Sequence, residues 1–230
     1  MMRSFSRLMM VFALISMGVG VSTWIVAQDG GTGLKRPLDL PSGGRGSDEE
    51  EEDAPETISF YGGEYEGDGF FFCLDKSCSM GWGSAMTVLK AEMSETLSGL
   101  TDNSEFSIVA FSDGWISWSP IPQEGNSGNR GSAIGWVQAL NPAGGTCMAP
   151  AGVETIRINN LSDKEAKRII VLGDGVPNCP GPAETVSTMT GANWQRTPID
   201  TIYIAADSGG VAFMQQLAAA NAGNFSQPGQ

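Results

Sequence analysis

Five oxygen-bearing side chains follow apolar or glycine-rich stretches of the chain and have the chemistry to hold a hard divalent cation. They are two carboxylates and three hydroxyls: Asp75, Ser77, Ser79, Thr146 and Asp174. Mg²⁺ takes about six oxygen ligands near 2.1 Å and usually keeps some waters. Asp75, Ser77 and Ser79 alternate along one predicted turn, so their side chains can converge on one point. Two carboxylates balance the charge of such an ion, the hydroxyls add neutral ligands, and an open position can then accept an anionic group.

The segments around these residues predict an α/β fold. Continuous apolar runs predict buried strands, and apolar residues at helical spacing predict helices. We expect strands at 70–75, 106–111, 168–172 and 199–204, an edge strand at 58–61, a short antiparallel strand at 115–118, and helices at 85–100, 132–140, 149–158, 182–193 and 211–221. This alternation indicates a Rossmann-like three-layer sandwich, with a mostly parallel central sheet, helices on both faces and one short antiparallel edge strand. Ligands of such sheets bind outside the carboxyl ends of the strands, where Asp75 and Asp174 are expected.

The order of these motifs resembles the von Willebrand factor type A family. Three family features occur in order, namely a DxSxS pattern, a Gly-Gly-Thr loop and a strand ending in aspartate, and they supply Asp75, Ser77, Ser79, Thr146 and Asp174. The resemblance extends over roughly residues 68–226. Gly173 departs from the family, which usually has threonine there, but that position is not a metal ligand.

The resemblance implies a metal-ion-dependent adhesion site. In the family this site binds Mg²⁺, with Mn²⁺ or Ca²⁺ as substitutes, and an Asp or Glu of a protein partner completes the coordination. The resemblance also implies that the hydroxyls of Ser77, Ser79 and Thr146 bind the ion directly, whereas Asp75 and Asp174 bind partly through water.

Three residues beside these motifs are assigned to a partner-binding rim: Lys76, Trp82 and Asp113. Trp82 follows the DxSxS turn closely, and exposed aromatic side chains are enriched in binding surfaces. Packing of Trp82 against the first predicted helix is the alternative. Lys76 is interpreted as a solvated rim charge rather than a catalytic lysine.

The four cysteines leave several pairings open. Cys78, Cys147 and Cys179 fall on the loops of the predicted metal site, and Cys73 lies inside the first strand, where we expect a buried small apolar residue. A disulfide between two rim loops is expected in an exported protein, although four cysteines allow three connectivities. We favour Cys147–Cys179, with Cys78–Cys179 as the next choice. Zinc binding by the thiolates is a weaker alternative, because the spacings match no zinc ribbon.

The composition excludes several kinds of chemistry. The 230 residues include no histidine, and 26 acidic against 13 basic residues give a net charge of −13. Without histidine, Ser-His-Asp and Cys-His hydrolysis, HExxH zinc proteases and His-ligated zinc or haem sites are excluded. The acidic balance argues against a nucleic-acid partner, because phosphates would be repelled.

The beginning of the chain predicts export. Residues 1–27 combine Arg3 and Arg7 with an apolar run at 8–27, which is typical of a cleaved signal peptide or an uncleaved membrane anchor. Either one places the rest of the chain outside the cytoplasm, as a secreted, periplasmic or cell-surface protein.

An acidic linker is expected next. Residues 28–57 lack apolar periodicity, are rich in glycine and proline and contain the acidic block 48–53, so they predict a disordered spacer. A calcium-buffering or partner-binding tail is the alternative for this block. The type A-like domain is then expected at 58–230.

The sequence therefore predicts an exported adhesion-type module that binds Mg²⁺ and captures a carboxylate of a protein partner. One alternative is a structural surface or matrix component with a non-functional metal site. The other is a metal-dependent phosphotransferase or hydrolase. A phosphotransferase of the haloacid dehalogenase type needs a second carboxylate two residues after Asp75, but position 77 is serine, and no GxxxxGK[ST] phosphate loop occurs. We therefore do not expect an enzyme, and we expect membrane contact only through the N-terminal segment.

Overall fold

The computed structural model describes residues 55–206 and 208–228. The predicted export segment and nearly all of the predicted linker, including its acidic block, lie outside the described residues. Among the described residues, none of the helices combines the length and the apolar character that a bilayer crossing requires.

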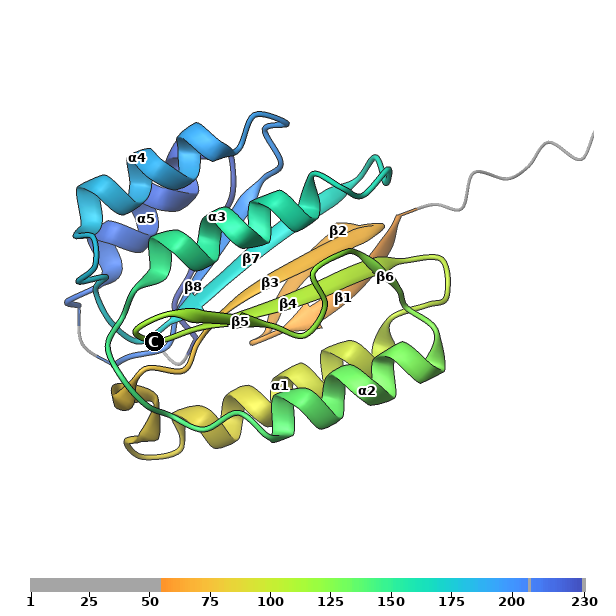
Figure 1. Cartoon of the computed structure of the whole chain (residues 1–230), viewed down its shortest axis with the longest axis horizontal. Coiled ribbons are helices and arrows are strands. Elements are labelled where there is room, and N and C mark those ends of the chain that lie inside the picture. The colour runs from red at the N-terminus through yellow and green to blue at the C-terminus, as the bar shows by residue number, and fades with distance from the viewer. Residues whose placement is uncertain (1–54, 207, 229–230) are drawn as a thin grey trace, which may run out of the picture. The chain divides into compact units, whose positions relative to one another are not determined.

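A seven-stranded sheet forms the centre of the described residues (Figure 1). Its strands are β3 (Gly69–Asp75), β4 (Glu105–Phe111), β5 (Trp115–Ser117), β6 (Gln123–Glu124), β7 (Lys167–Gly173), β8 (Ile199–Tyr203) and β9 (Phe225–Ser226). The order is β5-β4-β3-β7-β8-β9, and β6 also pairs with β4. The pairs among β3, β4, β7, β8 and β9 are parallel, whereas β5 and β6 run antiparallel to β4. The predicted mostly parallel sheet with a short antiparallel edge strand is thus confirmed.

Helices cover both faces of this sheet (Figure 1). The first face carries α1 (Ala85–Gly99) and α2 (Ser127–Gln138), and the second carries α3 (Met148–Asn159), α4 (Pro182–Ala192) and α5 (Val211–Ala220). A short 3₁₀ helix, η1 (Cys78–Gly81), lies between β3 and α1. The predicted three-layer sandwich is therefore confirmed.

Strand β3 shows why the sheet is buried on both faces. All seven of its residues are buried. Phe70, Phe72 and Leu74 belong to the apolar cluster under α1 and α2, whereas Phe71 and Cys73 belong to the cluster under α3, α4 and α5. Alternate side chains of a strand point to opposite faces, so one apolar run serves both layers. Each fully buried Phe or Leu stabilises the fold by about 1.5–3 kcal/mol.

A β-hairpin packs on the face of the sheet that α1 covers, and only its first strand was predicted from the sequence. Strands β1 (Glu56–Phe60) and β2 (Gly63–Gly67) form a separate antiparallel two-stranded sheet, rather than an edge of the main one. The turn between them has positive φ at both Tyr61 (51°) and Gly62 (72°), the requirement of a two-residue hairpin turn. The N–H of Tyr61 donates to Glu92 Oε2 of α1 at 2.7 Å, which fixes the hairpin against that helix.

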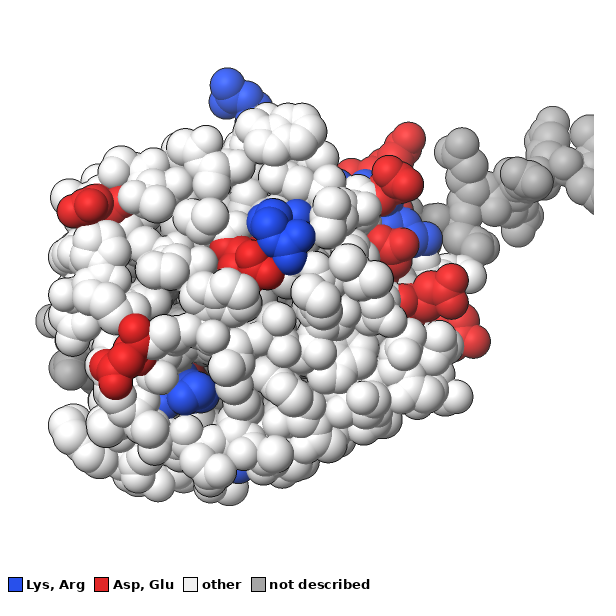
Figure 2. Space-filling model, viewed as in Figure 1, with Lys and Arg blue, Asp and Glu red and all other residues white. Residues whose placement is uncertain are grey.

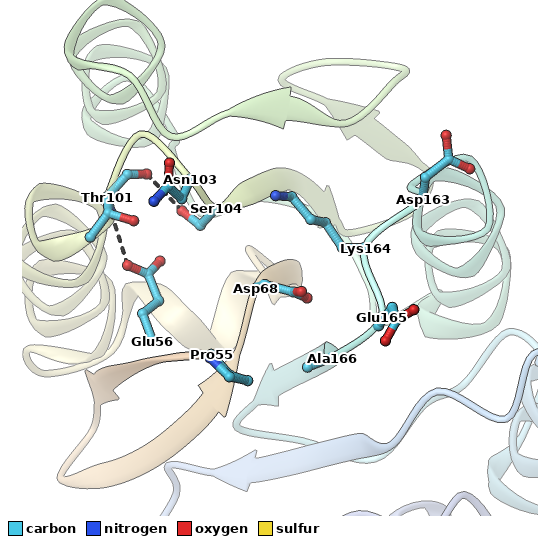
Figure 3. A pocket seen from close by; sticks show the side chains of 10 residues that line it. All are labelled: Pro55, Glu56, Asp68, Thr101, Asn103, Ser104, Asp163, Lys164, Glu165 and Ala166. Atoms are coloured by element: carbon cyan, nitrogen blue, oxygen red, sulfur yellow. Dashed lines mark hydrogen bonds between the residues drawn. The ribbon is translucent and has the colours of Figure 1, made fainter. Parts of the chain in front are cut away.

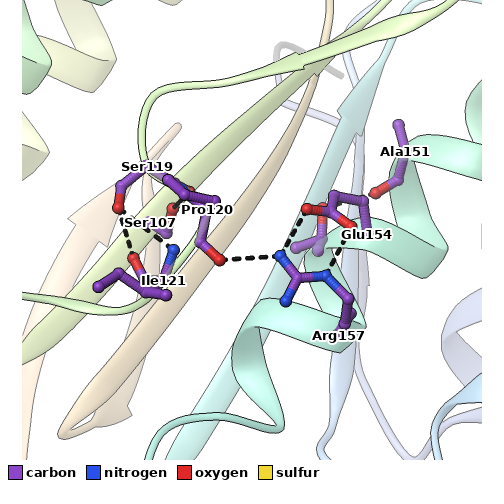
Figure 4. Close-up of polar contacts among 8 residues, drawn as sticks. Ser107, Ser119, Pro120, Ile121, Ala151, Glu154 and Arg157 are labelled. Carbon is purple, nitrogen blue, oxygen red and sulfur yellow. Dashed lines mark hydrogen bonds and ion pairs between the residues drawn. The ribbon is translucent and has the colours of Figure 1, made fainter.

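Polar contacts fasten the segment that follows β5 (Figure 4). Ser107 Oγ of β4 donates to the carbonyl of Ser119 at 2.9 Å, and Ser119 Oγ donates to the carbonyl of Ile121 at 2.7 Å. From α3, the guanidinium of Arg157 donates to the carbonyl of Pro120 at 2.8 Å and pairs with Glu154 at 2.7 Å. The edge of the sheet is thus tied both to its neighbouring strand and to a covering helix.

Helix α2 begins at Ser127, five residues before its predicted start at 132. The side chain of Asn126 accepts a hydrogen bond from the N–H of Asn129 at 3.0 Å, which caps the helix. Gly128 and Gly131 lower the helix propensity of the first turns, so periodicity alone placed the start too late.

Candidate metal centre

The candidate site lies where the strand order reverses. Strands β3 and β7 are parallel neighbours, and the chain continues from β3 to β4 on one side and from β7 to β8 on the other. Loops that leave adjacent strands in opposite directions open a crevice at the carboxyl edge of the sheet, where ligands of such folds bind. The turn after Asp75 and the turn after Gly173 both start at this edge.

Four of the five predicted ligands are connected by hydrogen bonds. The N–H of Ser77 donates to Asp75 Oδ1 at 2.7 Å, and this bond folds the turn back over the end of β3. The hydroxyl oxygens of Ser77 and Ser79 are 3.0 Å apart. Ser79 Oγ then donates to Asp174 Oδ1 at 2.7 Å, across 95 residues of sequence. The structure therefore brings both carboxylates and two of the hydroxyls into one cluster.

The ionised form of Asp75 is destabilised in this cluster. Its side chain is fully buried, and Oδ2 has no hydrogen-bond partner within the described residues. Burial raises the pKa of Asp75 to about 7, and the charge of Asp174 adds to the effect, while contacts with Ser77 and the backbone of Asp174 offset part of it. A cation beside the two carboxylates would favour their charged forms. The buried oxygen without a partner and the all-oxygen donor set therefore fit a hard divalent ion.

Thr146, the fifth predicted ligand, is held in the adjoining loop through its backbone. The carbonyl of Gly144 accepts a hydrogen bond from the N–H of Cys78 at 3.0 Å, which joins this loop to the turn after β3. The N–H of Thr146 donates to Asn178 Oδ1 at 3.3 Å, and the N–H of Asn178 donates back to the carbonyl of Thr146 at 3.1 Å. The loops that carry Thr146 and Asp174 are thus connected to each other.

Glycines are needed where this edge is crowded. Gly144 has φ +75°, and a Cβ there would lie 2.4 Å from Asp113 Oδ2. A Cβ at Gly173 would lie 3.2 Å from Asp75 Oδ2. The departure from the usual threonine at 173 therefore leaves space next to the buried carboxylate oxygen that has no partner.

The structure joins Cys147 and Cys179 by a disulfide, the pairing that was favoured from the sequence. Their Cα atoms are 4.7 Å apart, and the bond crosslinks the Thr146 loop to the segment after Asp174. Cys73 is a buried free thiol and Cys78 an exposed one, so the alternative pairing of Cys78 with Cys179 is not formed.

The three predicted rim residues have different surroundings. Lys76 Nζ donates to Ser112 Oγ at 3.0 Å. Asp113 Oδ1 accepts a hydrogen bond from the N–H of Gly145 at 2.6 Å, so this carboxylate positions the Gly-Gly-Thr loop. Trp82 is 77% exposed, which rules out the alternative that it is packed against the first helix.

Two supporting residues were missed from the sequence. Asn178 holds the Thr146 loop, and Ser112 accepts from both Lys76 and, through its carbonyl, the N–H of Cys147 at 2.7 Å. Asn178 stands directly before Cys179, so the predicted disulfide could have pointed to it. Ser112 ends an apolar strand and offered no signal beyond its place at the carboxyl edge.

Within residues 55–206 and 208–228, no group of three or more histidine, cysteine, aspartate or glutamate side chains is arranged to hold a metal ion. Asp75 and Asp174 supply only two carboxylates. A site at this edge therefore depends on the serine and threonine hydroxyls as well.

The amino edge of the sheet carries a cavity of about 660 Å³ (Figure 3). Its charged lining residues are Glu56, Asp68, Asp163, Lys164 and Glu165. Figure 3 shows the lysine extending into this space. Glu56 Oε2 accepts a hydrogen bond from the N–H of Thr101 at 3.0 Å, which ties the start of β1 to the turn before β4.

Comparison with known proteins agrees with the observed topology. The sequence model of a family described as von Willebrand factor type A domain matches residues 71–226, from β3 to β9. No curated protein matches the chain in sequence.

Solved structures share the fold at low sequence identity. A von Willebrand factor type A protein from Catenulispora acidiphila is 21% identical with a TM-score of 0.65, over 71% of this chain and 40% of that one. The PilB minor pilin from Streptococcus sanguinis is 12% identical with a TM-score of 0.58, over 75% and 57%. The pilus adhesin SpaC from Lactobacillus rhamnosus GG is 15% identical with a TM-score of 0.58, over 70% and 28%. The chain covers less than two thirds of each of these three structures, and at these identities the likeness shows the fold.

Proposed function

The chain belongs to the von Willebrand factor type A domain family, and from this premise we propose that it is an exported protein-binding module with a metal-ion-dependent adhesion site. The ligands proposed for the ion are Asp75, Ser77, Ser79, Thr146 and Asp174. The ion proposed is Mg²⁺, with Mn²⁺ or Ca²⁺ as substitutes. An Asp or Glu of a protein partner completes the coordination.

One observation carries this proposal. Asp75 is buried with an oxygen that has no hydrogen-bond partner in the described residues, beside a chain of hydrogen bonds that runs through Ser77 and Ser79 to Asp174. A buried carboxylate of this kind is costly unless a cation or a donor compensates it. Glycine at 173 leaves room beside that oxygen.

The residues of the chain position the oxygen ligands. The N–H of Ser77 fixes the Asp75 carboxylate, and the hydroxyl of Ser79 orients Asp174. Asp113 and the Cys147–Cys179 disulfide hold the loop that carries Thr146. When bound, the ion supplies the positive charge that allows an acidic group of a partner to approach.

The charge of the domain explains why a cation would be required. Residues 68–230 contain 8 basic and 15 acidic residues, a net charge of −7. Such a surface repels an acidic partner at low ionic strength. Binding of that partner should therefore depend on the divalent ion and be lost in EDTA, with a weaker dependence on monovalent salt.

We place the domain outside the cytoplasm. A disulfide persists in oxidising compartments, and the first 27 residues predict an export segment. Similar folds occur in a minor pilin and a pilus adhesin, which by their names belong to surface appendages. These neighbours favour a binding role, and we assign Asp75 and Asp174 to metal ligation rather than to acid–base catalysis.

A calorimetric titration of the metal-free domain with Mg²⁺ tests this proposal. We expect a binding heat in the wild type and at least a 100-fold loss of affinity, about 2.7 kcal/mol, in the Asp75→Ala variant. Asp102→Ala removes a carboxylate whose side chain is 75% exposed and is the matched control that should leave the heat unchanged. Equal heats for Asp75→Ala and the wild type would contradict the metal site.

A further inference from the structure

A cavity of about 630 Å³ opens directly beside the candidate metal centre. Ser79 and Asp174, two of the proposed metal ligands, line it. The other walls come from distant parts of the chain: Tyr61 in the hairpin turn, Trp82 after η1, Val88 and Glu92 of α1, and Ile204 after β8. A ligand on the metal therefore has this cavity as its immediate neighbour.

The walls of this cavity are mainly apolar and accessible. Trp82 is 77% exposed and Val88 is 39% exposed, although both are large apolar side chains beside a polar site. Ile204, Ala205 and the ring of Pro228 extend the apolar lining. Exposed apolar side chains grouped around a concave surface mark interaction sites on soluble proteins.

The charges in the cavity restrict which side chain can enter. Glu92 lines the cavity, and its Oε2 accepts the hydrogen bond from the N–H of Tyr61 at 2.7 Å. Asp174 lies at the side of the metal centre. Two carboxylates repel a second acidic side chain, whereas the apolar walls gain from burying a large apolar one.

We propose that this cavity, bounded by Trp82, Val88 and Ile204, receives the side chain next to the metal-bound carboxylate of the partner and selects a large apolar residue there. The partner is then a segment in which a single Asp or Glu is followed by a residue such as Leu, Met or Phe. This inference rests on the proposed metal-dependent function and specifies its partner.

The geometry favours an apolar side chain over a basic one. A basic side chain would find the Glu92 carboxylate, but one oxygen of that group already accepts a backbone hydrogen bond, and the apolar side chains of Trp82 and Val88 line the same cavity. An ammonium placed there would lose much of its hydration, whereas an apolar side chain would not. We therefore do not expect the partner to carry a basic residue at this position, and the experiment below tests this directly.

Capped tetrapeptides, acetyl-Gly-Glu-Xaa-Gly-amide with Leu, Ala, Lys or Glu as Xaa, test this selectivity on the full chain saturated with Mg²⁺. We expect the Leu peptide to bind about tenfold more tightly than the Ala peptide, and the Lys and Glu peptides to bind no better than Ala. Binding is followed by isothermal titration calorimetry, which does not depend on Trp82 and therefore serves the wild type and the tryptophan variants alike. Equal affinities across the set, or tightest binding by the Lys or Glu peptide, would overturn the proposal.

Two matched tryptophan variants test whether this cavity provides the preference for the Leu peptide. Trp82→Ala should reduce the advantage of Leu over Ala from about tenfold to less than about threefold. Trp194→Ala, which removes a tryptophan that is 71% exposed and does not line this cavity, should preserve the full advantage. A preference that survives in Trp82→Ala would show that another surface provides it.

Titration of the same samples with Mg²⁺ alone distinguishes a failure of the proposed metal site from a failure of the inference about the cavity. If Mg²⁺ binds and the peptides show no apolar preference, only the inference about the cavity fails. If Mg²⁺ does not bind to the wild type, the proposed function fails and the inference fails with it.

Discussion

The two edges of the central sheet both gather carboxylates, but they balance the negative charge in different ways. At the amino edge, Glu56, Asp68 and Glu105 each have a buried oxygen without a hydrogen-bond partner in the described residues, as Asp75 does at the carboxyl edge. Lysines accompany the carboxylates of the amino edge, and the region of Figure 2 over the amino ends of the strands shows acidic and basic side chains together.

The charged neighbours that act on the pKa of a buried group differ between the two edges. At the amino edge, burial lowers the pKa of Lys167, while Asp163, Glu105 and Asp68 favour its charged form. At the carboxyl edge, the charged neighbour that acts on the Asp75 carboxyl is another acid, Asp174, which raises its pKa further. The amino edge thus contains its own cations, whereas no basic side chain among the described residues contributes to the pKa of the buried acid at the carboxyl edge.

The edges also differ in how their loops are held. The carboxyl edge is built from the loops after β3, after β7 and before α3, and the Cys147–Cys179 disulfide crosslinks the last two. The turns of the amino edge are held by hydrogen bonds to the strands, such as those from the N–H groups of Asp68 and Gly69 to the carbonyl of Ala166. A binding site assembled from loops needs such reinforcement more than a structural edge does.

The largest stability effect is expected from breaking that crosslink. A paired Cys147→Ser, Cys179→Ser variant removes a disulfide that spans 32 residues and should lose about 2–4 kcal/mol of unfolding free energy. Urea denaturation measures this loss. Cys78→Ser, which removes an exposed free thiol, is the control and should change stability very little.

Hydrogen exchange then shows which edge the crosslink supports. Amide exchange in the disulfide-free variant should rise at 144–147 and 174–179, while the turn at 101–104 keeps its protection. Equal loss of protection at both edges would contradict the difference drawn between them.

A smaller effect is expected from neutralising the buried acid of the carboxyl edge. Burial raises the folded-state pKa of Asp75 from 3.8 to about 7. Below pH 3.8 the carboxyl is protonated in both folded and unfolded chains and changes nothing. As pH rises from 3.8 to 7, the unfolded chain releases the proton first, so stability falls, and above pH 7 the penalty is complete.

The shift in the pKa of Asp75 corresponds to about 4 kcal/mol at pH 8. A buried Asn amide without a full set of partners offsets part of this gain, so Asp75→Asn should stabilise the metal-free domain at pH 8 by about 2 kcal/mol, or about 4–8 °C in Tm. At pH 3 the variant and the wild type should melt together. Saturating Mg²⁺ should reverse the order at pH 8, because only the wild type gains from binding the ion. Thermal denaturation in EDTA and in Mg²⁺ checks both statements, and a stability gain that is the same at pH 3 and pH 8 would argue against a buried charge.

The parts of the fold that were predicted from the sequence are those with long apolar runs. Strands β3, β4, β7 and β8 were placed to within one residue at each end because their residues are buried on both faces. Strand β2 was missed because Tyr65 is the one apolar side chain among glycines and glutamates in Gly63–Gly67. The two-residue strands β6 and β9 are too short to show any periodicity.

The proposed ligands of the candidate site were named from the sequence, whereas most contacts that hold their loops in place were not. The DxSxS turn is local, and its hydrogen bond from Ser77 to Asp75 spans two residues. The contacts of Gly145 with Asp113 and of Thr146 with Asn178 each span 32 residues and follow from the three-dimensional fold. The cavity beside the metal centre could not be predicted either, because its walls come from the hairpin, α1 and the segment after β8.

Diffraction from crystals of the domain grown with Mn²⁺, measured at an energy where manganese scatters anomalously, tests the central claim most directly. We predict one strong anomalous peak at the carboxyl edge, in contact with the oxygens of Ser77, Ser79 and Thr146 and beside Asp75 and Asp174. No peak at that position, or a peak in the cavity lined by Glu56 and Asp68 instead, would contradict it.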